Sequence, residues 1–262
     1  MALPIYQVDA FTSKQFGGNP AAVIPLEKWL DDETLQNIAA ENNLSETAYF
    51  VKEGDHYHIR WMTPAAEVNL CGHATLASAH VIFNFIEKDS SKIKFASRSG
   101  DLFVERDGDM LTLNFPTNKP EPLKIPEGID KCFDQSPIEI LEGGEYLFVV
   151  FDSEDYIKNY VPNFENIKKI HHHAVIITAK SSKADFVSRM FAPNVGIDED
   201  PVTGSAHTVL TPYWSEKLGK NKLTALQVSK RLGELICENL GERVKISGKA
   251  ALYLTGSINL DF

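Results

Sequence analysis

Two similar segments occur about half a chain length apart in this sequence of 262 residues. The first contains Arg60-Trp-Met-Thr-Pro64 and then Cys71-Gly-His-Ala-Thr75. The second contains Arg189-Met-Phe-Ala-Pro193 and then Thr203-Gly-Ser-Ala-His207. An internal repeat indicates that one structural unit occurs more than once, so it limits the possible folds more than any single motif does. We therefore expect two similar halves.

Each copy of the repeat is predicted to form a strand, a loop and a helix that begins at the glycine. Residues 57–62 alternate between apolar and polar and are β-prone. Residues 74–85 are apolar on nearly every side, which is typical of a helix buried all round. The matching helix, residues 206–218, contains Pro212, which removes a helical hydrogen bond and should kink the helix near Thr208.

Most of the remaining chain is predicted to form strands, with one further helix over residues 31–42 that has an acidic first turn. The Pro- and Lys-rich stretch 116–129 is the expected linker. These patterns favour an α+β fold with domains at residues 1–116 and 117–262, in which a curled sheet surrounds one apolar helix per domain. The final strand is free to cross back to the first domain.

Charge and composition limit the partners and the compartment. The net charge of −10 does not favour binding to nucleic acid. The three cysteines form no CxxC pair, and no signal peptide or membrane-spanning apolar run is visible, so we expect a cytoplasmic protein without a membrane partner.

Glu46 is the first candidate for chemistry, because it follows a predicted helix and opens a strand of hydroxylated and apolar residues. A carboxyl group in such surroundings can both accept and return a proton. By its local sequence alone, a surface glutamate is the simpler interpretation.

Gly72 and His73 form the second candidate. Free amides at a helix start can hold a carboxylate, and a histidine there can bind substrate or cap the helix.

The second half offers a comparable segment, Glu199-Asp200-Pro-Val-Thr203-Gly204-Ser205. Thr203 is predicted to be the helix N-cap, and Gly204 and Ser205 are predicted to offer amides to an anion. An acidic loop that only caps a helix is the alternative. Repeat symmetry predicts that the two helix starts point into one cleft.

Two further segments are ambiguous. The glycines of Gly17-Gly18-Asn19-Pro20 allow close approach to a ligand or form a plain turn. No dinucleotide or P-loop motif is present. The run His171-His172-His173 is not predicted to bind a metal, because adjacent strand residues point to opposite faces, so we expect an unusual strand edge and no metal site.

Taken in order, four segments resemble the PhzF (phenazine biosynthesis) family: DAFTSKQFGGNPAAV at 9–23, NLSETAY at 43–49, VNLCGHAT at 68–75 and EDPVTGSAH at 199–207. The closest resemblance is to its branch of MAWD-binding-protein-like (PBLD-type) members. The resemblance implies a diaminopimelate-epimerase-like fold of two pseudo-symmetric domains, each a β-barrel around a central helix.

The resemblance also implies roles for individual residues. Glu46 would move the proton, assisted by His73 and Asp200. Gly204 and Ser205 would bind a small carboxylate substrate, and Gly18, Asn19 and Gly72 are expected to contribute to that binding. It further implies isomerisation without a cofactor or metal, and a homodimer.

Two departures and two alternatives accompany this hypothesis. Leu232 stands where the family usually has glycine, and Pro212 is unusual in its helix. Cys71 is at the position of a catalytic cysteine in related epimerases, but Thr203 is at the second such position. This pair resembles hydroxyproline dehydratases, although a packed Cys71 is the favoured interpretation. The other alternative is a binding protein without turnover.

Overall fold

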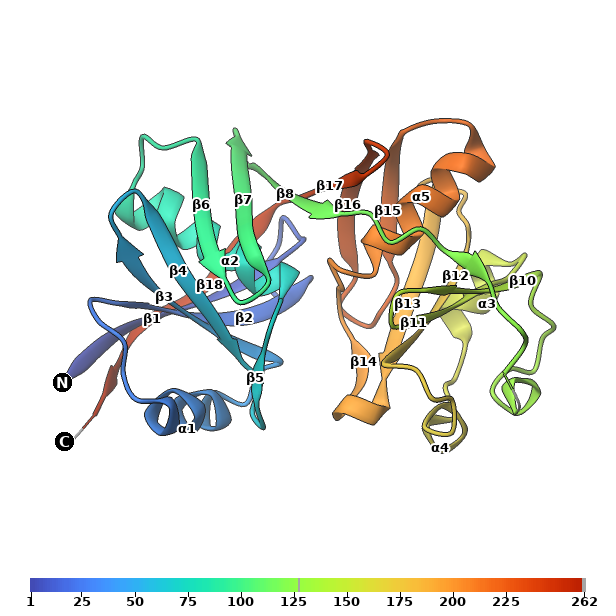
Figure 1. Ribbon diagram of the computed structural model, residues 1–262, viewed down its shortest axis with the longest axis horizontal. Helices are drawn as coiled ribbons and strands as arrows, with labels where there is room; N and C mark the ends of the chain where they lie inside the picture. The colour runs from blue at the N-terminus through green and yellow to red at the C-terminus, as the bar shows by residue number, and fades with distance from the viewer. Residues whose placement is uncertain (127, 261–262) are drawn as a thin grey trace. The chain divides into compact units, whose positions relative to one another are not determined.

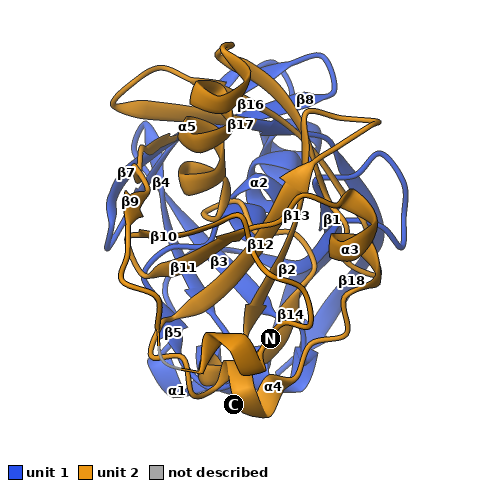
Figure 2. Cartoon of the chain, turned by 90° about the vertical axis from the view of Figure 1, so that its right-hand side faces the viewer, with its two compact units in different colours: residues 1–114, 247–262 blue, residues 115–246 orange. Residues whose placement is uncertain are grey.

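The computed structural model describes residues 1–126 and 128–260 (Figure 1). The chain forms two compact units (Figure 2). Unit 1 comprises residues 1–114 together with the chain from residue 247 onward, and unit 2 comprises residues 115–246. Compared with the expected domains at 1–116 and 117–262, the last strand therefore returns to the first unit. No helix among the described residues is long and apolar enough to cross a membrane.

Strands make up most of both units. Those that begin in unit 1, together with the returning last strand, are β1 (Ala2–Ala10), β2 (Asn19–Leu26), β3 (Glu46–Glu53), β4 (His56–Met62), β5 (Glu67–Val68), β6 (Lys92–Ser97), β7 (Gly100–Asp107), β8 (Met110–Pro116) and β18 (Ala250–Asn259). Those that begin in unit 2 are β9 (Glu121–Pro122), β10 (Glu139–Gly143), β11 (Tyr146–Val150), β12 (Ala174–Lys180), β13 (Phe186–Ala192), β14 (Ile197–Asp200), β15 (Lys222–Gln227), β16 (Gly233–Asn239) and β17 (Arg243–Gly248).

The two units have the same order of strand pairings. In unit 1, β1 pairs antiparallel with β2, β2 parallel with β3, β3 antiparallel with β4, β4 antiparallel with β5 and parallel with β6, and β6 antiparallel with β7. In unit 2, β10 to β16 repeat this series in the same order and with the same directions. The duplication that was predicted from the short repeat is confirmed by the topology.

The helices lie in the connections between these strands. They are α1 (Asp32–Asn42), α2 (Gly72–Val81), a π-helical turn η1 (Ile82–Ile86), η2 (Ile129–Lys131), α3 (Glu154–Asn159), α4 (Phe164–Ile167), η3 (Pro193–Val195) and α5 (His207–Leu218). The predicted helix at 31–42 is confirmed. Asp31 caps it by accepting a hydrogen bond from the Thr34 amide at 2.9 Å, and its buried face is Leu35, Ile38 and Ala39.

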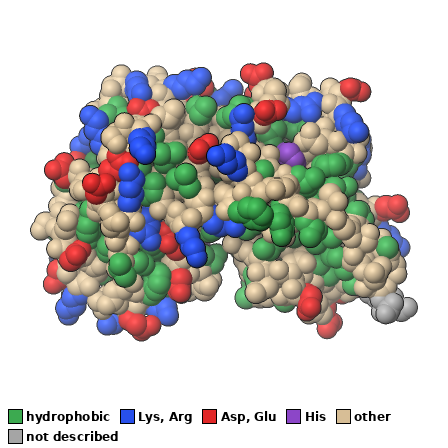
Figure 3. Space-filling model, turned by 180° about the vertical axis from the view of Figure 1, so that it is seen from behind, with side chains coloured by type: hydrophobic (Ala, Val, Ile, Leu, Met, Phe, Trp, Pro, Cys, Tyr) green, Lys and Arg blue, Asp and Glu red, His purple; other side chains and the backbone are tan. Residues whose placement is uncertain are grey.

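α2 is the central helix of unit 1, and β1, β2, β3 and β18 contact it (Figure 1). Every residue of α2 except His80 is buried, as the uniformly apolar run predicts. A helix with no polar face is stable only when protein covers all of its sides. The sheet of unit 1 therefore curls around α2. On the face of the protein seen in Figure 3, acidic and basic side chains are interspersed with apolar ones.

α5 begins at His207, three residues after the predicted start at Gly204. Residues 204–206 form a tighter turn, in which the amides of His207 and Thr208 donate to the carbonyls of Gly204 and Ser205 at 3.1 and 3.0 Å. The prediction that Thr203 caps the helix is wrong, because its hydroxyl donates to the Asp200 carboxylate instead.

Pro212 lies inside α5, which runs on to Leu218. A proline has no N–H, so the carbonyl of Thr208, four residues earlier, loses its helical donor. The amide of Asn118 replaces it at 3.2 Å, and the Asn118 side chain also donates to the Thr208 hydroxyl at 3.1 Å. The carbonyl that the proline leaves free is thus satisfied within unit 2.

Leu232 has a φ angle of 58°, in the left-handed region that glycine adopts without strain. The glycine-like conformation of the loop is therefore kept although a leucine occupies the position. A left-handed non-glycine residue costs about 1–2 kcal/mol, and the greater chain entropy of glycine offsets about 0.5–1 kcal/mol of that. We expect Leu232→Gly to raise the free energy of unfolding by up to ~1.5 kcal/mol in urea titrations. Leu232→Ala keeps the Cβ atom, so a gain of equal size with alanine would contradict the strain argument.

Candidate active site

Glu46 is buried, with 8% of its surface exposed, although it is the first residue of β3. The chain reaches it from α1 through Asn43, whose left-handed φ of 50° ends that helix. His73 lies in the first turn of α2 and is 4% exposed. Its Nε2 atom is 3.2 Å from Oε2 of Glu46. Unit 1 therefore brings together two of the three predicted catalytic residues.

The other ring nitrogen of His73 has two neighbours. The Asn19 side-chain nitrogen lies 3.1 Å from Nδ1, and the Cys71 sulfur lies 3.5 Å from it. In the neutral imidazole the Asn19 amide donates to Nδ1 and the ring proton is on Nε2, facing Glu46. In the charged imidazole both nitrogens carry protons, and only the side-chain oxygen of Asn19 can pair with Nδ1. Asn19 thus orients the imidazole. The sequence interpretation of Cys71 as a merely packed residue missed its contact with His73.

The electrostatics of this cluster favour a charged imidazole beside a neutral thiol. Burial raises the pKa of Cys71 to about 11, and the Glu46 carboxylate adds to the rise. For His73, burial opposes the charged form, but its contacts with Cys71 and Glu46 raise its pKa well above the ordinary value. Since the thiol keeps its proton, the negative charge that raises the pKa of His73 is that of the Glu46 carboxylate.

The backbone before Asn19 can accept only glycine at position 18. Gly18 has a φ of +58°, and a Cβ atom there would lie 2.1 Å from the carbonyl oxygen of Ala10. The loop is further held by the Phe16 amide, which donates to the buried Asp9 carboxylate at 2.9 Å. Gly18 therefore permits the close turn that places Asn19 against His73, and this is a structural reason for the glycine.

The N-terminus of α2 has no side-chain cap, because its N-cap residue Cys71 makes no such hydrogen bond. The first amides of a helix lack intrahelical partners, and together with the helix dipole they attract anions. Gly72, the first residue of this ten-residue helix, is buried beside His73. This arrangement is suited to hold a carboxylate next to the Glu46–His73 pair.

Unit 2 positions the third predicted catalytic residue, Asp200, at the end of β14. Thr203 donates to the Asp200 side chain, while Gln227 accepts from the Thr203 amide at 2.8 Å and donates to the Asp200 carbonyl at 2.8 Å. All three residues are buried. Gln227 was not predicted, and only its place next to β14 reveals its role.

Ser205 accepts a hydrogen bond of 2.8 Å from the hydroxyl of Tyr146, the first residue of β11. Burial raises the pKa of Tyr146, with the Asp200 carboxylate contributing. Tyr146 was not predicted either, because nothing in its local sequence distinguishes it from any other strand residue. Gly204, Ser205 and Asp200 therefore belong to unit 2, and that they share one cleft with Glu46 stays a prediction.

The repeated arginines anchor equivalent strands in the two units. Arg60 of β4 binds both carboxylate oxygens of Glu67 at 2.8 and 2.7 Å, and Arg189 of β13 binds both of Glu199 at 2.7 and 2.9 Å. Each glutamate lies on the short strand before the helix start. Because paired, bidentate contacts of this kind fix geometry, they hold β5 before Cys71 and β14 at Asp200.

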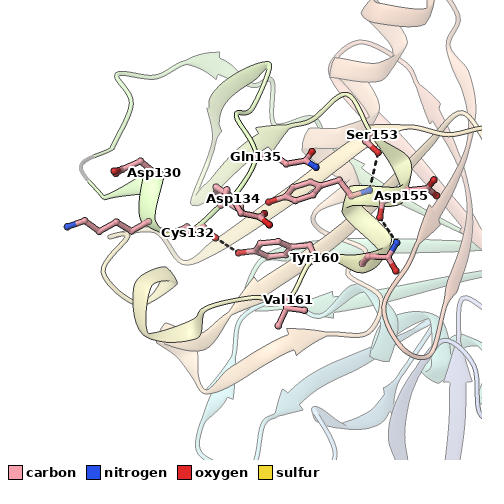
Figure 4. Close-up of a pocket in the computed structure, with 12 residues that line it drawn as sticks. Asp130, Cys132, Asp134, Gln135, Ser153, Asp155, Tyr160 and Val161 are labelled. Atoms are coloured by element: carbon pink, nitrogen blue, oxygen red, sulfur yellow. Dashed lines mark hydrogen bonds between the residues drawn. The ribbon is translucent and has the colours of Figure 1, made fainter.

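A separate cavity of about 760 Å³ lies in unit 2 near α3 (Figure 4). Two of its polar side chains have structural partners: Ser153 caps α3, and the Tyr160 hydroxyl donates to the Cys132 carbonyl at 2.7 Å. None of the predicted catalytic residues lines it. The chemistry of the chain therefore points to the buried cluster and not to this cavity.

The three consecutive histidines precede β12 instead of forming a strand edge, so that part of the prediction is wrong. His172 contacts Glu142 at 3.2 Å, and His173 lies 4.0 Å from Glu145. Among the described residues, the group whose atoms could share a metal ion is Glu46, Cys71 and His73.

The chain thus combines a two-unit α+β fold with a buried acid–histidine pair and an uncapped helix start. Residues 8–256 match the family described as phenazine biosynthesis-like protein. The chain belongs to this family, the PhzF family. It is 52% identical over 260 residues to an uncharacterized isomerase of Pseudomonas aeruginosa, covering 99% of this chain and all of that protein.

Two other comparisons agree with this placement. The human phenazine biosynthesis-like domain-containing protein is 39% identical over 290 residues, with 98% of this chain and 99% of that protein covered. The crystal structure of a PhzF family protein of Enterococcus faecalis superposes with a TM-score of 0.96 at 45% identity, over 99% of this chain and all of that one. Distant solved epimerases share the fold, which is diaminopimelate-epimerase-like. The relatives define the enzyme class as isomerase.

Proposed function

We propose that this protein is a cofactor-independent isomerase that moves a proton on a small carboxylate or amino-acid-like substrate. Glu46 takes the proton from carbon and returns it elsewhere on the same face. The observation that supports this most directly is the buried contact of 3.2 Å between Glu46 and His73. A general base must lie within reach of the proton that it takes, and it is helped by a neighbour that stabilises its charge, as the imidazole of His73 would do for Glu46.

The neighbouring groups have supporting roles in this mechanism. The uncapped start of α2 would bind the substrate carboxylate and stabilise negative charge that develops next to it. His73, oriented by Asn19, would face the Glu46 carboxylate through Nε2 and stabilise its charged form. Asp200, Gly204 and Ser205 are proposed to assist in binding, as the family resemblance implies.

The experiment is solvent-deuterium uptake into a panel of unsaturated and cyclic amino acids and related carboxylates. An isomerase of this kind incorporates deuterium from solvent at the carbon that Glu46 deprotonates or reprotonates. The compound that exchanges identifies the substrate class, and the position of the label identifies the proton that moves. No uptake with any compound would favour a binding protein that keeps the fold without turnover.

A second candidate chemistry is favoured by one observation, the 3.5 Å contact between the Cys71 sulfur and His73. In that mechanism Cys71 and Thr203 would exchange the proton, as in epimerases or dehydratases. The raised pKa of the Cys71 thiol, about 11, does not favour it, because the thiolate is the reactive form.

Cys71→Ala separates the two mechanisms. If Glu46 is the base, we expect the rate of deuterium uptake to fall by less than ~10-fold, since the thiol only packs against His73 and general acid–base groups contribute ~10²–10⁴-fold. The measurement is the initial exchange rate at saturating substrate, with Cys132→Ala as the control for loss of a buried thiol elsewhere. A fall of ~10³-fold in Cys71→Ala would instead support the Cys71/Thr203 mechanism.

A further inference from the structure

The Glu46–Cys71–His73 cluster combines three side chains of the types that bind zinc. One carboxylate oxygen, the thiol sulfur and one ring nitrogen lie within 4.8 Å of one another, and all three residues are buried. Zinc sites in proteins use cysteine sulfur, histidine nitrogen and carboxylate oxygen. Glu46 lies at the start of β3, and Cys71 and His73 lie at the start of α2, so the contact between these two elements brings the three residues together.

Two atoms of the cluster have bonding capacity left. Oε2 of Glu46 and Nε2 of His73 are buried and make no aligned hydrogen bond within the described residues, although they are close enough for an ion pair. Buried polar atoms are normally satisfied, so a pair of this kind is suited to take up a ligand. The same two atoms are at the centre of the proposed proton transfer.

The spacing of the three side chains approaches that of a tetrahedral site but does not yet meet it. Zn–S bonds of about 2.3 Å and Zn–N or Zn–O bonds of about 2.0–2.2 Å place neighbouring ligand atoms about 3.3–3.6 Å apart. The Cys71 sulfur is 3.5 Å from Nδ1 of His73, and Oε2 of Glu46 is 3.2 Å from Nε2. One ring nitrogen binds a given ion, so the third ligand atom, which lies within 4.8 Å of the others, must move closer by side-chain rotation.

We propose that Glu46, Cys71 and His73 form a binding site for a zinc-like divalent cation, and that occupancy inhibits the enzyme. Three protein ligands leave the fourth position to water or another small ligand, unlike a closed structural site. Binding releases to solvent the thiol proton of Cys71 and the proton on the ring nitrogen of His73 that ligates the ion. It also ties up the Glu46 carboxylate, which can then no longer accept a proton. The inhibition rests on the proposed function, whereas the binding does not.

The proposal that the cluster binds a metal ion is tested without any substrate. We would titrate the full-length protein with Co²⁺, whose bond to a thiolate gives a charge-transfer absorption, and then displace it with Zn²⁺. We expect one equivalent to bind with that absorption in the wild type and in Cys132→Ala, which loses a buried thiol elsewhere. Cys71→Ala should lack the absorption and bind at least ~10-fold more weakly. Absence of the absorption in the wild type, or its persistence in Cys71→Ala, would overturn the site.

The proposal that metal binding inhibits the enzyme is tested by deuterium uptake into whichever compound the wild type accepts. One equivalent of Zn²⁺ should suppress uptake, and a chelator should restore it. The uptake that remains in Cys71→Ala should be at least ~10-fold less sensitive to Zn²⁺. Full uptake in the zinc-loaded wild type would overturn inhibition while leaving the site in place. If no compound exchanges, the proposed function fails, and the cobalt result still decides the metal site.

Discussion

Glu46→Gln is expected to lower the rate of solvent-deuterium uptake by ~10²–10⁴-fold, the usual contribution of a general acid–base group. Glutamine has nearly the same shape as glutamate but cannot accept a proton from carbon. Since the carboxylate acts in the chemical step and not in holding the substrate carboxylate, kcat should fall while KM changes little. The measurement is the exchange rate over a range of substrate concentrations.

Glu53→Gln is the matched control, because it makes the same change at the exposed end of the same strand, β3. It should exchange deuterium at the wild-type rate. Urea unfolding of both variants shows whether a loss of exchange comes from loss of the fold. Equal uptake by wild type and Glu46→Gln on an accepted substrate would remove Glu46 from the mechanism.

Acid should destabilise the protein through His207, the first residue of α5. This side chain is fully buried, and burial lowers its pKa from 6.5 to about 4, only partly opposed by the hydrogen bond with the Thr203 carbonyl. The folded protein therefore keeps His207 neutral where the unfolded chain is already protonated. Stability is complete above pH 6.5 and is lost progressively as the pH falls toward about 4.

The expected loss from His207 is roughly 3 kcal/mol, since each unit of pKa difference is worth about 1.4 kcal/mol. His207→Asn removes the titrating group and leaves an amide that can donate to the Thr203 carbonyl, which lies 2.8 Å from Nδ1. We would compare the free energies of unfolding of the two proteins in urea between neutral pH and about pH 4. The wild type should lose more stability over this range, and parallel curves would contradict the role of His207.

The features that could be predicted from the sequence are those that depend on residues close together in the chain. The α2 helix follows from an apolar run, α1 from its acidic first turn and buried stripe, and the two units from the repeat around Arg60 and Arg189. The start of α5 could not be predicted. The start of this helix depends on the partner of the Thr203 hydroxyl, which is either a helix amide or the Asp200 carboxylate. Gln227 of β15 also hydrogen-bonds to Thr203 and so helps to fix the second arrangement.

The candidate site likewise combines residues that motifs predicted with contacts that only the folded chain shows. Glu46 and His73 were found through motifs, and their proximity follows from the start of β3 lying beside the start of α2. The contacts of Asn19 and Cys71 with His73 are tertiary, and so is the bond from Tyr146 to Ser205. Burial and hydrogen bonding between residues far apart in sequence leave no periodic pattern, so only the folded chain reveals them.

The pairing of β18 with β1 has a consequence for the order of synthesis. Ala2 lies opposite Asn259 and Ala10 opposite Ala250, so β1 leaves the ribosome long before the strand with which it pairs. The strands β10 to β16, by contrast, form one uninterrupted stretch of chain. Unit 2 therefore has all of its strands available while unit 1 still lacks one edge. We expect a nascent chain arrested before residue 250 to expose β1 to proteases and chaperones, although the residues of the Glu46 cluster have already been made.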